Sequence, residues 1–312
     1  MKAAQINQYG EPEVLQITDD APKPSAGEGQ VLVEVHAAGV NPWDCKVRSG
    51  AAQQWVQVNF PATLGGDVAG IVSEVGTGVA DIQVGDEVFG QANSVGGAGS
   101  FAEFTPVSAS AVALKPRSID FTTAAAVPLA AASARQALVD HIGLQAGQKV
   151  LIHGGAGGIG VFAVQLAKQL GAYVATTVST EDVDFAKQLG ADEVIDYKNQ
   201  DFTAAIKDFD AVFNVAGAEE TTRQSFAVLK TGGMLVTMGS LPTEDLAKQH
   251  GVEAIAQQSH VKTEGLEAIA KLIDEGAFKV YVDKTFTLDD AAAAMAYLES
   301  GSHRGKVVIT VK

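Results

Sequence analysis

Hydrophobic and polar positions follow different patterns on the two sides of about residue 122. Before it, short alternating or apolar runs such as 31–35 and 69–75 are separated by glycines and prolines, and no long stretch has helical periodicity. Runs of this kind, bounded by turn residues, are typical of β-strands. We predict that residues 1–122 form a β-rich domain, an irregular small barrel with a hairpin through residues 86–89.

Beyond residue 122, stretches with helical and strand character alternate. An alanine-rich segment, 122–142, is followed by an apolar strand at 149–153, and further strands are predicted at 173–178, 193–195, 210–215 and 233–238. Strands that alternate with helices favour a parallel sheet with helices on both faces. The fold class predicted is therefore α/β, with a doubly wound domain at residues 123–276 beside the β-rich domain.

The last part of the chain offers two helices, 264–275 and 288–299, and a final strand, 306–311. This strand has no place in the alternating pattern of the second domain. We predict that it returns to the first domain, so that residues 277–312 complete that domain.

A glycine-rich loop joins the strand at 149–153 to the amphipathic segment 161–170. Gly155, Gly157 and Gly160 have the spacing G-x-G-x-x-G, in which the first glycine permits a tight turn, the second a close approach to a pyrophosphate, and the third close packing of helix on strand. Free amides at the helix start receive the anion. We therefore predict a dinucleotide cofactor bound by these three glycines with Gly158 and Ile159.

The end of the next strand decides between NADH and NADPH in proteins of this kind, because a carboxylate there binds the ribose hydroxyls of NADH. Here the strand ends in hydroxyl residues, including Thr177 and Ser179, which leave room for the 2′-phosphate of NADPH, but Glu181 and Asp182 follow and would repel it. Lys187 would offset that repulsion if its side chain pointed back; otherwise it is an ordinary exposed lysine. NADPH is the cofactor predicted, with NADH as the open alternative.

The composition limits the partners. A formal charge of −15 over 312 residues repels nucleic acids and anionic membranes. No segment has the roughly 18 consecutive apolar residues of a membrane span, and the first ten residues have no apolar core segment. We therefore expect a soluble, cytoplasmic protein without nucleic-acid or membrane partners. Because Cys45 is the only cysteine, we also expect no internal disulfide and no zinc site built from several thiolates.

Several separated motifs, in the same order, resemble those of the zinc-independent quinone oxidoreductases of the medium-chain dehydrogenase/reductase superfamily. They are Asn41-Pro-Trp-Asp44, Pro61-Ala-Thr-Leu-Gly-Gly-Asp67, the loop from His153 to Gly160, Leu189-Gly-Ala-Asp-Glu-Val-Ile-Asp-Tyr197 and the closing Arg304-Gly-Lys306. The resemblance implies a GroES-like first domain completed by the C-terminal strand, a Rossmann second domain, an active site in the cleft between them, and a homodimer formed through a sheet edge of the Rossmann domain.

The metal ligands of the zinc alcohol dehydrogenases in that superfamily are missing. A cysteine stands there at the position that resembles Asn41, and a His-Glu pair at the position of Gly66-Asp67. We predict that no metal is bound, which removes the usual means of forming an alkoxide and favours reduction of an electrophilic acceptor. The short-chain dehydrogenases are excluded, because no tyrosine is followed by a lysine four positions later.

The resemblance places Asn41 and Asp44 beside the nicotinamide and the acceptor. The alternative is a turn started by Asn41-Pro and capped by Asp44. Lys46 is a candidate for stabilising an oxyanion, or else an exposed lysine. Cys45 is interpreted as a small buried hydrophobe, and Asp67 as either a structural hydrogen-bond acceptor or a pocket residue.

The remaining cofactor candidates lie at strand ends or match family positions. Ligands bind at the carboxyl ends of parallel strands, and the alternative for each residue is an ordinary strand end. The candidates are Ser133, Asn214, Val215, Gly217, Met238, Gly239, Ser240, Arg304 and Lys306.

The predicted reaction is transfer of hydride from the reduced nicotinamide to a quinone or to the β-carbon of an activated alkene. The cofactor supplies this chemistry and the protein supplies orientation and electrostatics, so no nucleophile is required. An enoyl or alkenal reductase is the alternative enzyme. A dinucleotide-binding sensor or structural protein is the alternative outside enzymes, because cofactor binding does not require turnover.

Overall fold

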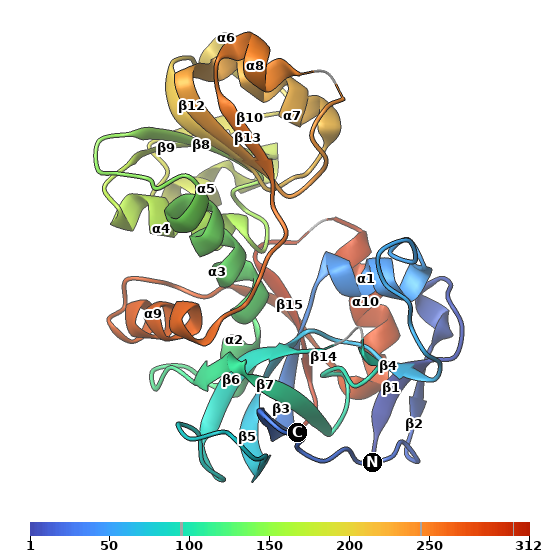
Figure 1. Cartoon of the computed structure of the whole chain (residues 1–312). Coiled ribbons are helices and arrows are strands. Elements are labelled where there is room, and N and C mark those ends of the chain that lie inside the picture. The colour runs from blue at the N-terminus through green and yellow to red at the C-terminus, as the bar shows by residue number, and fades with distance from the viewer. Residues whose placement is uncertain (94–95, 244, 302) are drawn as a thin grey trace. The chain divides into compact units, whose positions relative to one another are not determined.

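The structure, a computed structural model, describes residues 1–93, 96–243, 245–301 and 303–312. The chain divides into two compact units (Figure 1). Unit 1 contains residues 1–132 and 261–312, and unit 2 contains residues 133–260.

Unit 1 is built mainly on antiparallel pairing, although β14 and β15 pair in parallel. Among the described residues it has a three-stranded sheet in the order β2-β1-β4 and a six-stranded sheet in the order β14-β15-β3-β5-β6-β7, in which β3 also pairs with β7 and closes a small barrel. The strands are β1 Ala3–Ile6, β2 Leu15–Thr18, β3 Gln30–Val40, β4 Ala62–Thr63, β5 Asp67–Val75, β6 Glu87–Ala92, β7 Phe104–Leu114, β14 Val282–Thr287 and β15 Lys306–Thr310. The predicted β-rich domain and its β5–β6 hairpin are confirmed.

Every second side chain of a strand faces the same side of its sheet, so alternate residues of β3 point into the barrel and fill it. Val31, Val33 and Val35 are fully buried and pack with Val68 and Val88 of the neighbouring strands. The C-terminal strand returns to this unit as predicted: β15 runs antiparallel to β3, with Val307 opposite Val40.

The helices of unit 1 come from distant parts of the chain. They are α1 Pro42–Ser49, α2 Phe121–Ala125, α9 Thr263–Asp274 and α10 Ala291–Glu299. α1 and α10 are joined by Arg48, a buried guanidinium whose two terminal nitrogens donate to the carboxylate of Glu299 at 3.0 Å each and whose Nε donates to the Gly10 carbonyl. No sequence signal marked this pair, which ties the last turn of α1 to α10.

Unit 2 is a parallel sheet with helices on both faces (Figure 1). Within the described residues the strand order is β10-β9-β8-β11-β12-β13, the 3-2-1-4-5-6 order of dinucleotide-binding domains. The strands are β8 Lys149–His153, β9 Tyr173–Val178, β10 Glu193–Asp196, β11 Phe209–Asn214, β12 Leu229–Thr237 and β13 Glu253–Ala256, and the helices are α4 Gly160–Gln169, α5 Val183–Gln188, α6 Phe202–Ala205, α7 Glu219–Ser225 and α8 Leu246–His250. The predicted doubly wound fold is confirmed.

Two features differ from the prediction. The alanine-rich segment is divided: α2 ends at Ala125, and α3 (Pro128–Arg135) begins at a proline, because the proline ring and missing N–H prevent an uninterrupted helix. Strand β13 was not predicted, because its sequence Glu-Ala-Ile-Ala is poor in the β-branched and aromatic residues that mark strands.

The division into units also lies elsewhere than expected. The sequence placed the boundaries after residues 122 and 276, whereas compactness places them after residues 132 and 260. α9 accounts for the second difference, since the hydroxyl of Thr263 at its start lies 2.9 Å from the carbonyl oxygens of Ala109 and Val112, both in β7.

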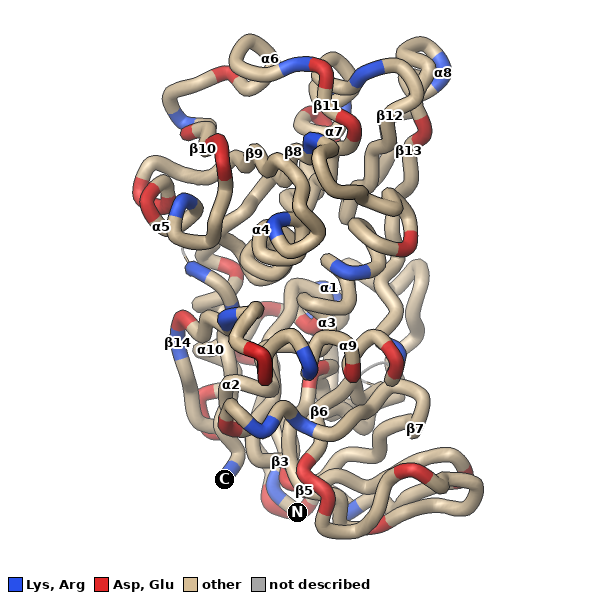
Figure 2. The backbone as a smooth tube through the Cα atoms, turned by 90° about the vertical axis from the view of Figure 1, so that its left-hand side faces the viewer, with Lys and Arg blue, Asp and Glu red and all other residues tan. Residues whose placement is uncertain are grey.

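The charged positions are spread over both units, with acidic residues in excess (Figure 2). Around α5 and β10, acidic and basic positions lie together. No helix in the described part of the chain is long and apolar enough to cross a membrane.

Candidate cofactor and acceptor sites

The glycine loop after β8 makes its turn at Gly154, whose φ of +76° favours glycine. The tight turn had been assigned to Gly155, whose φ is not in that region. Gly155 is required for another reason: a Cβ there would lie 2.1 Å from the Thr176 hydroxyl oxygen of β9. The loop therefore depends on both glycines, one for its backbone angle and one for its contact with the neighbouring strand.

Gly157 and Gly160 differ in the space available for a side chain. A Cβ on Gly160 would lie 2.1 Å from the Gly154 carbonyl oxygen, so the third glycine lets the start of α4 pack against the loop, rather than against the strand as expected. A Cβ on Gly157 would meet only that same carbonyl at 3.5 Å, which is an ordinary contact. Within the described residues, no side chain caps the start of α4. The site thus offers helix-start amides beside an open backbone, as an anion requires.

His153 supports this loop from behind. Its ring is buried, with Nδ1 3.0 Å from the Thr177 hydroxyl and Nε2 3.0 Å from the Ser225 hydroxyl. Because the Ser225 hydroxyl already donates to the Thr221 carbonyl, it accepts from Nε2–H, and the Thr177 hydroxyl donates to Nδ1. Burial lowers the pKa of His153 to about 3, so the ring is neutral.

Thr177, a predicted cofactor residue, is one of these supports. The amides of Gly154 and Gly155 donate to its carbonyl at 3.0 and 3.3 Å. Its side chain is nearly buried and engaged with His153. Thr177 therefore holds Gly154 and Gly155 against the end of β9.

The predicted residues after β11 and β12 come together. The Asn214 side chain accepts from the Gly217 amide and donates to the Thr222 hydroxyl at 2.8 Å, which fixes the turn containing Val215. A Cβ on Gly239 would lie 2.0 Å from the Gly217 carbonyl oxygen, so the two loops touch through their backbones. Exposed Ser240 follows Gly239.

Ser133 lies with Met238 and with two residues that sequence analysis missed, Gln257 and Ser259. The Gln257 amide nitrogen donates to the Ser133 carbonyl at 3.1 Å and lies 3.7 Å from the Met238 sulfur, while the Ser133 hydroxyl donates to the Ser259 hydroxyl at 2.7 Å. Among the described residues, the buried Gln257 Oε1 has no hydrogen-bond partner. Gln257 follows the unpredicted strand β13, so no sequence signal marked it.

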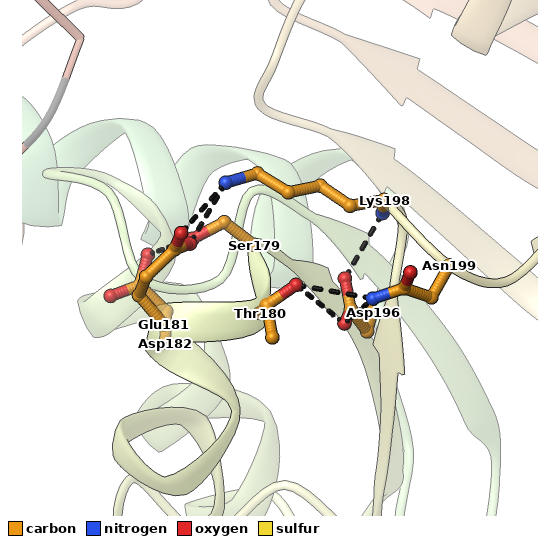
Figure 3. A network of polar contacts seen from close by, with 7 residues as sticks. All are labelled: Ser179, Thr180, Glu181, Asp182, Asp196, Lys198 and Asn199. Atoms are coloured by element: carbon orange, nitrogen blue, oxygen red, sulfur yellow. Dashed lines mark hydrogen bonds and ion pairs between the residues drawn. The ribbon is translucent and has the colours of Figure 1, made fainter.

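The residues after β9 form a polar network with the turn after β10 (Figure 3). Ser179 donates to Asp182 at 2.8 Å, and Glu181 is paired with Lys198. Lys187, the lysine predicted to approach the cofactor, lies 3.5 Å from Asp184 on its own helix and is largely exposed. Lys198 was missed, although it lies three residues after the predicted strand 193–195 and two residues after β10.

In unit 1 a buried polar network surrounds the start of α1. Asn41 donates through Nδ2 to Asp67 Oδ2 at 2.9 Å, and its Oδ1 accepts from Lys306 Nζ. Lys306 also donates to the Val40 carbonyl at 3.0 Å and lies 3.4 Å from Asp67 Oδ2. The ammonium of Lys306 is thus the positive charge at the centre of this network.

Asp44 and Asp67 are the carboxylates of the network, and both are buried. Asp44 accepts from the Asn41 amide at 2.8 Å, as a helix cap does, and its Oδ1 has no hydrogen-bond partner among the described residues. Asp67 accepts from the Leu129 amide at the start of α3 at 2.9 Å. Burial raises the pKa of Asp44 to about 7 and raises that of Asp67 above its usual value.

The other predicted residues of unit 1 have simpler surroundings. Lys46 is exposed on α1, and Arg304 is exposed with its amide donating to Asp283. Cys45 is a small buried hydrophobe as expected, and burial raises the pKa of its thiol to about 12.

Two protein families match parts of this chain. Residues 27–117 match the alcohol dehydrogenase GroES-like domain, and residues 189–309 match the family described as zinc-binding dehydrogenase. The chain is 35% identical to a 2-methylene-furan-3-one reductase of Solanum lycopersicum, covering 99% of this chain and 79% of the relative. It is also 35% identical, with the same coverage, to an NADPH-dependent alkenal/one oxidoreductase of Arabidopsis thaliana chloroplasts.

A solved quinone oxidoreductase from Coxiella burnetii is 36% identical, has a TM-score of 0.91, and is matched over 100% of this chain and 99% of that one. This chain belongs to the quinone oxidoreductase-like group of the medium-chain dehydrogenase/reductase superfamily. The predicted family and the predicted combination of GroES-like and Rossmann-like domains are confirmed.

A nicotinamide dinucleotide fits the residues that this member of the group presents. The open side of Gly157 and the uncapped start of α4 suit a pyrophosphate, and Gln257 Oε1 is a free acceptor at the edge of the sheet where ligands bind. The described residues contain no group of three or more His, Cys, Asp or Glu side chains that could hold a metal ion.

Proposed function

We propose that this chain is an NADPH-dependent reductase that transfers hydride to a quinone or to the β-carbon of an enone or enal. The observation that carries the proposal is the open backbone at Gly157 beside the start of α4, on a parallel sheet with the strand order of dinucleotide-binding domains. The names of its relatives, an alkenal/one oxidoreductase and a furanone reductase, support a conjugated carbonyl as the acceptor.

When bound, the reduced nicotinamide supplies the hydride. The residues of unit 2 bind and orient the cofactor. The amides of residues 158–160 hold the pyrophosphate, since the Gly157 amide already donates to the Gly154 carbonyl at 3.1 Å. Gln257 Oε1 accepts from an N–H of the cofactor. In unit 1, we propose that Asn41 and Asp44 line the acceptor pocket. Lys306 neutralises the carboxylate of Asp67 there, so the network needs no metal cation. Lys46 is the candidate group for stabilising the oxyanion that follows hydride transfer.

Oxidation of NADPH, followed at 340 nm against a small panel of quinones and enones, tests the function. We expect turnover with at least one acceptor class, with the enones favoured by the names of the relatives. Cofactor binding without turnover on any acceptor would contradict the reductase and favour the dinucleotide-binding sensor. Turnover on quinones alone would contradict the enone assignment.

We propose that the reaction is independent of zinc, because the position of the lost metal ligand is occupied by Asn41, whose Oδ1 accepts from Lys306. Incubation with a chelator followed by gel filtration is expected to leave the rate of NADPH oxidation unchanged. Added zinc should not raise it. A rate that falls with chelation and returns with zinc would overturn this proposal.

Assembly and location are also proposals. The homodimer would form through an edge of the sheet of unit 2, where β10 and β13 are the outer strands; sedimentation equilibrium measures the mass. The absence of nucleic-acid and membrane partners and a cytoplasmic location rest on the sequence, and fractionation of the source cells tests the location.

A further inference from the structure

The ends of β9 and β10 lie next to each other, so the loops that follow the two strands are neighbours. The strands are parallel, with Asp196 opposite Val178, and the Tyr197 amide donates to the Val178 carbonyl at 3.1 Å. Residues 179–182 and 197–199 therefore run side by side, although they are separated by a helix along the chain.

Lys198 reaches across from the β10 loop to the β9 loop (Figure 3). Its Nζ lies 2.9 Å from both carboxylate oxygens of Glu181. Both side chains are about half exposed or more, at 47% and 66%. An exposed pair of this kind contributes little to stability, so either partner is available to a ligand that offers a stronger contact.

The turn that carries Lys198 is fixed from below by Asp196. Its carboxylate accepts from the Lys198 amide at 3.0 Å, and from the side chains of Thr180 and Asn199 at 2.7 Å each. These bonds join the two loops on the side away from the Glu181–Lys198 pair. The backbone of Lys198 is therefore held in place, while its side chain would give up the ion pair with Glu181.

The position of this pair relative to the pyrophosphate site follows from contacts within unit 2. The amides of Gly154 and Gly155 donate to the Thr177 carbonyl, two residues before Ser179. Ala156 of the glycine loop packs with Val178 and Ala186. A dinucleotide whose pyrophosphate lies on the loop thus places its adenosine ribose over the end of β9, as in other domains of this strand order.

We propose that Lys198 and Glu181 together select the cofactor. When NADPH is present, Lys198 breaks its ion pair with Glu181 and binds the 2′-phosphate. When NADH is present, Glu181 binds the ribose hydroxyls. The inference rests on the proposed function, since it assumes a nicotinamide dinucleotide at the glycine loop. The Ser179 hydroxyl donates to Asp182 and carries no charge to balance a phosphate. Lys187 lies beside Asp184 on α5 and on neither of the two loops, so it serves as the control.

The charges near the pair make the selection incomplete. Glu181 pairs with the Lys198 ammonium, and Asp182 and Asp196 add two more carboxylates on the same two loops, so a 2′-phosphate meets repulsion that Lys198 only partly offsets. The chain is therefore expected to bind both cofactors. Replacing either Lys198 or Glu181 is expected to change its preference between NADPH and NADH.

Isothermal titration of each variant with NADPH and with NADH tests the inference without any acceptor. Lys198→Met is expected to weaken NADPH binding by about 10- to 100-fold, the value of a charge-assisted contact, and to change NADH binding by less than about 3-fold. Lys187→Met is the matched control and is expected to leave both affinities unchanged. Glu181→Gln is expected to tighten NADPH and weaken NADH, each by about 3- to 10-fold.

Equal losses of both cofactors in Lys198→Met, or an equal effect of Lys187→Met on NADPH, would overturn the proposed selection. The wild-type affinities separate this failure from failure of the proposed function, because a chain that binds neither cofactor contradicts the function itself. Thermal melts of each variant show that the exposed substitutions leave the fold intact.

Discussion

Replacing Gly157 by aspartate is expected to weaken NADPH binding by at least about 100-fold, because a fixed carboxylate would stand where the pyrophosphate meets the helix-start amides. The geometry at this glycine makes the result specific. A Cβ at position 157 meets only a carbonyl oxygen at 3.5 Å, so the side chain fits and only its charge opposes the ligand. Isothermal titration with NADPH and with NADH measures the effect, and both should be lost together.

Gly157→Ala is the matched control, since it adds the Cβ without the charge. We expect it to melt within a few degrees of wild type and to bind NADPH far more tightly than Gly157→Asp. Wild-type affinity in Gly157→Asp would remove the glycine loop as the pyrophosphate site. The same experiment at Gly155 or Gly160 is uninformative, because a Cβ there would lie 2.1 Å from other atoms and disturb the loop itself.

Lys306→Met is expected to lower the free energy of unfolding by about 3–5 kcal/mol at pH 7.5, the usual effect of removing one partner of a buried ion pair. Lys306 is the cation among Asn41, Asp44 and Asp67, all of them at most 5% exposed. Without it, the carboxylate of Asp67 stays buried without a counter-ion. Urea denaturation followed by circular dichroism measures the loss.

The loss should shrink in acid. Burial holds the pKa of Asp44 at about 7, against 3.8 without burial, and raises that of Asp67. A carboxyl with a raised folded pKa destabilises the fold above that pKa, and the cost disappears as pH falls towards the unfolded value. The difference between wild type and variant should therefore decrease from pH 7.5 to pH 5.

Adding Asp67→Asn to Lys306→Met is expected to restore part of the stability at pH 7.5, since the amide needs no counter-ion. A loss that does not vary with pH, and that the second substitution does not reduce, would show that Lys306 acts through packing alone. That comparison keeps the test informative even where the single variant is poorly folded.

The sequence by itself determined the elements and the family. Strand β8 and the helix α4 after it were predicted almost to the residue, because an apolar strand, a glycine loop and an amphipathic helix each have a local pattern. The return of the C-terminal strand to the first domain was also predicted. The alanine-rich segment and strand β13 were exceptions, and for the first of them Pro128 in the sequence already marked the break.

Only the tertiary structure decided which side chains meet. Lys198 lies 17 residues from Glu181 and Lys306 lies 265 residues from Asn41, and both contacts depend on strand pairing and register. Gln257 joins Ser133 across 124 residues, at the end of a strand without a local signal. The physical reason is that hydrophobic periodicity and turn chemistry act over a few neighbouring residues, whereas a buried charge finds its partner through the packing of the whole sheet.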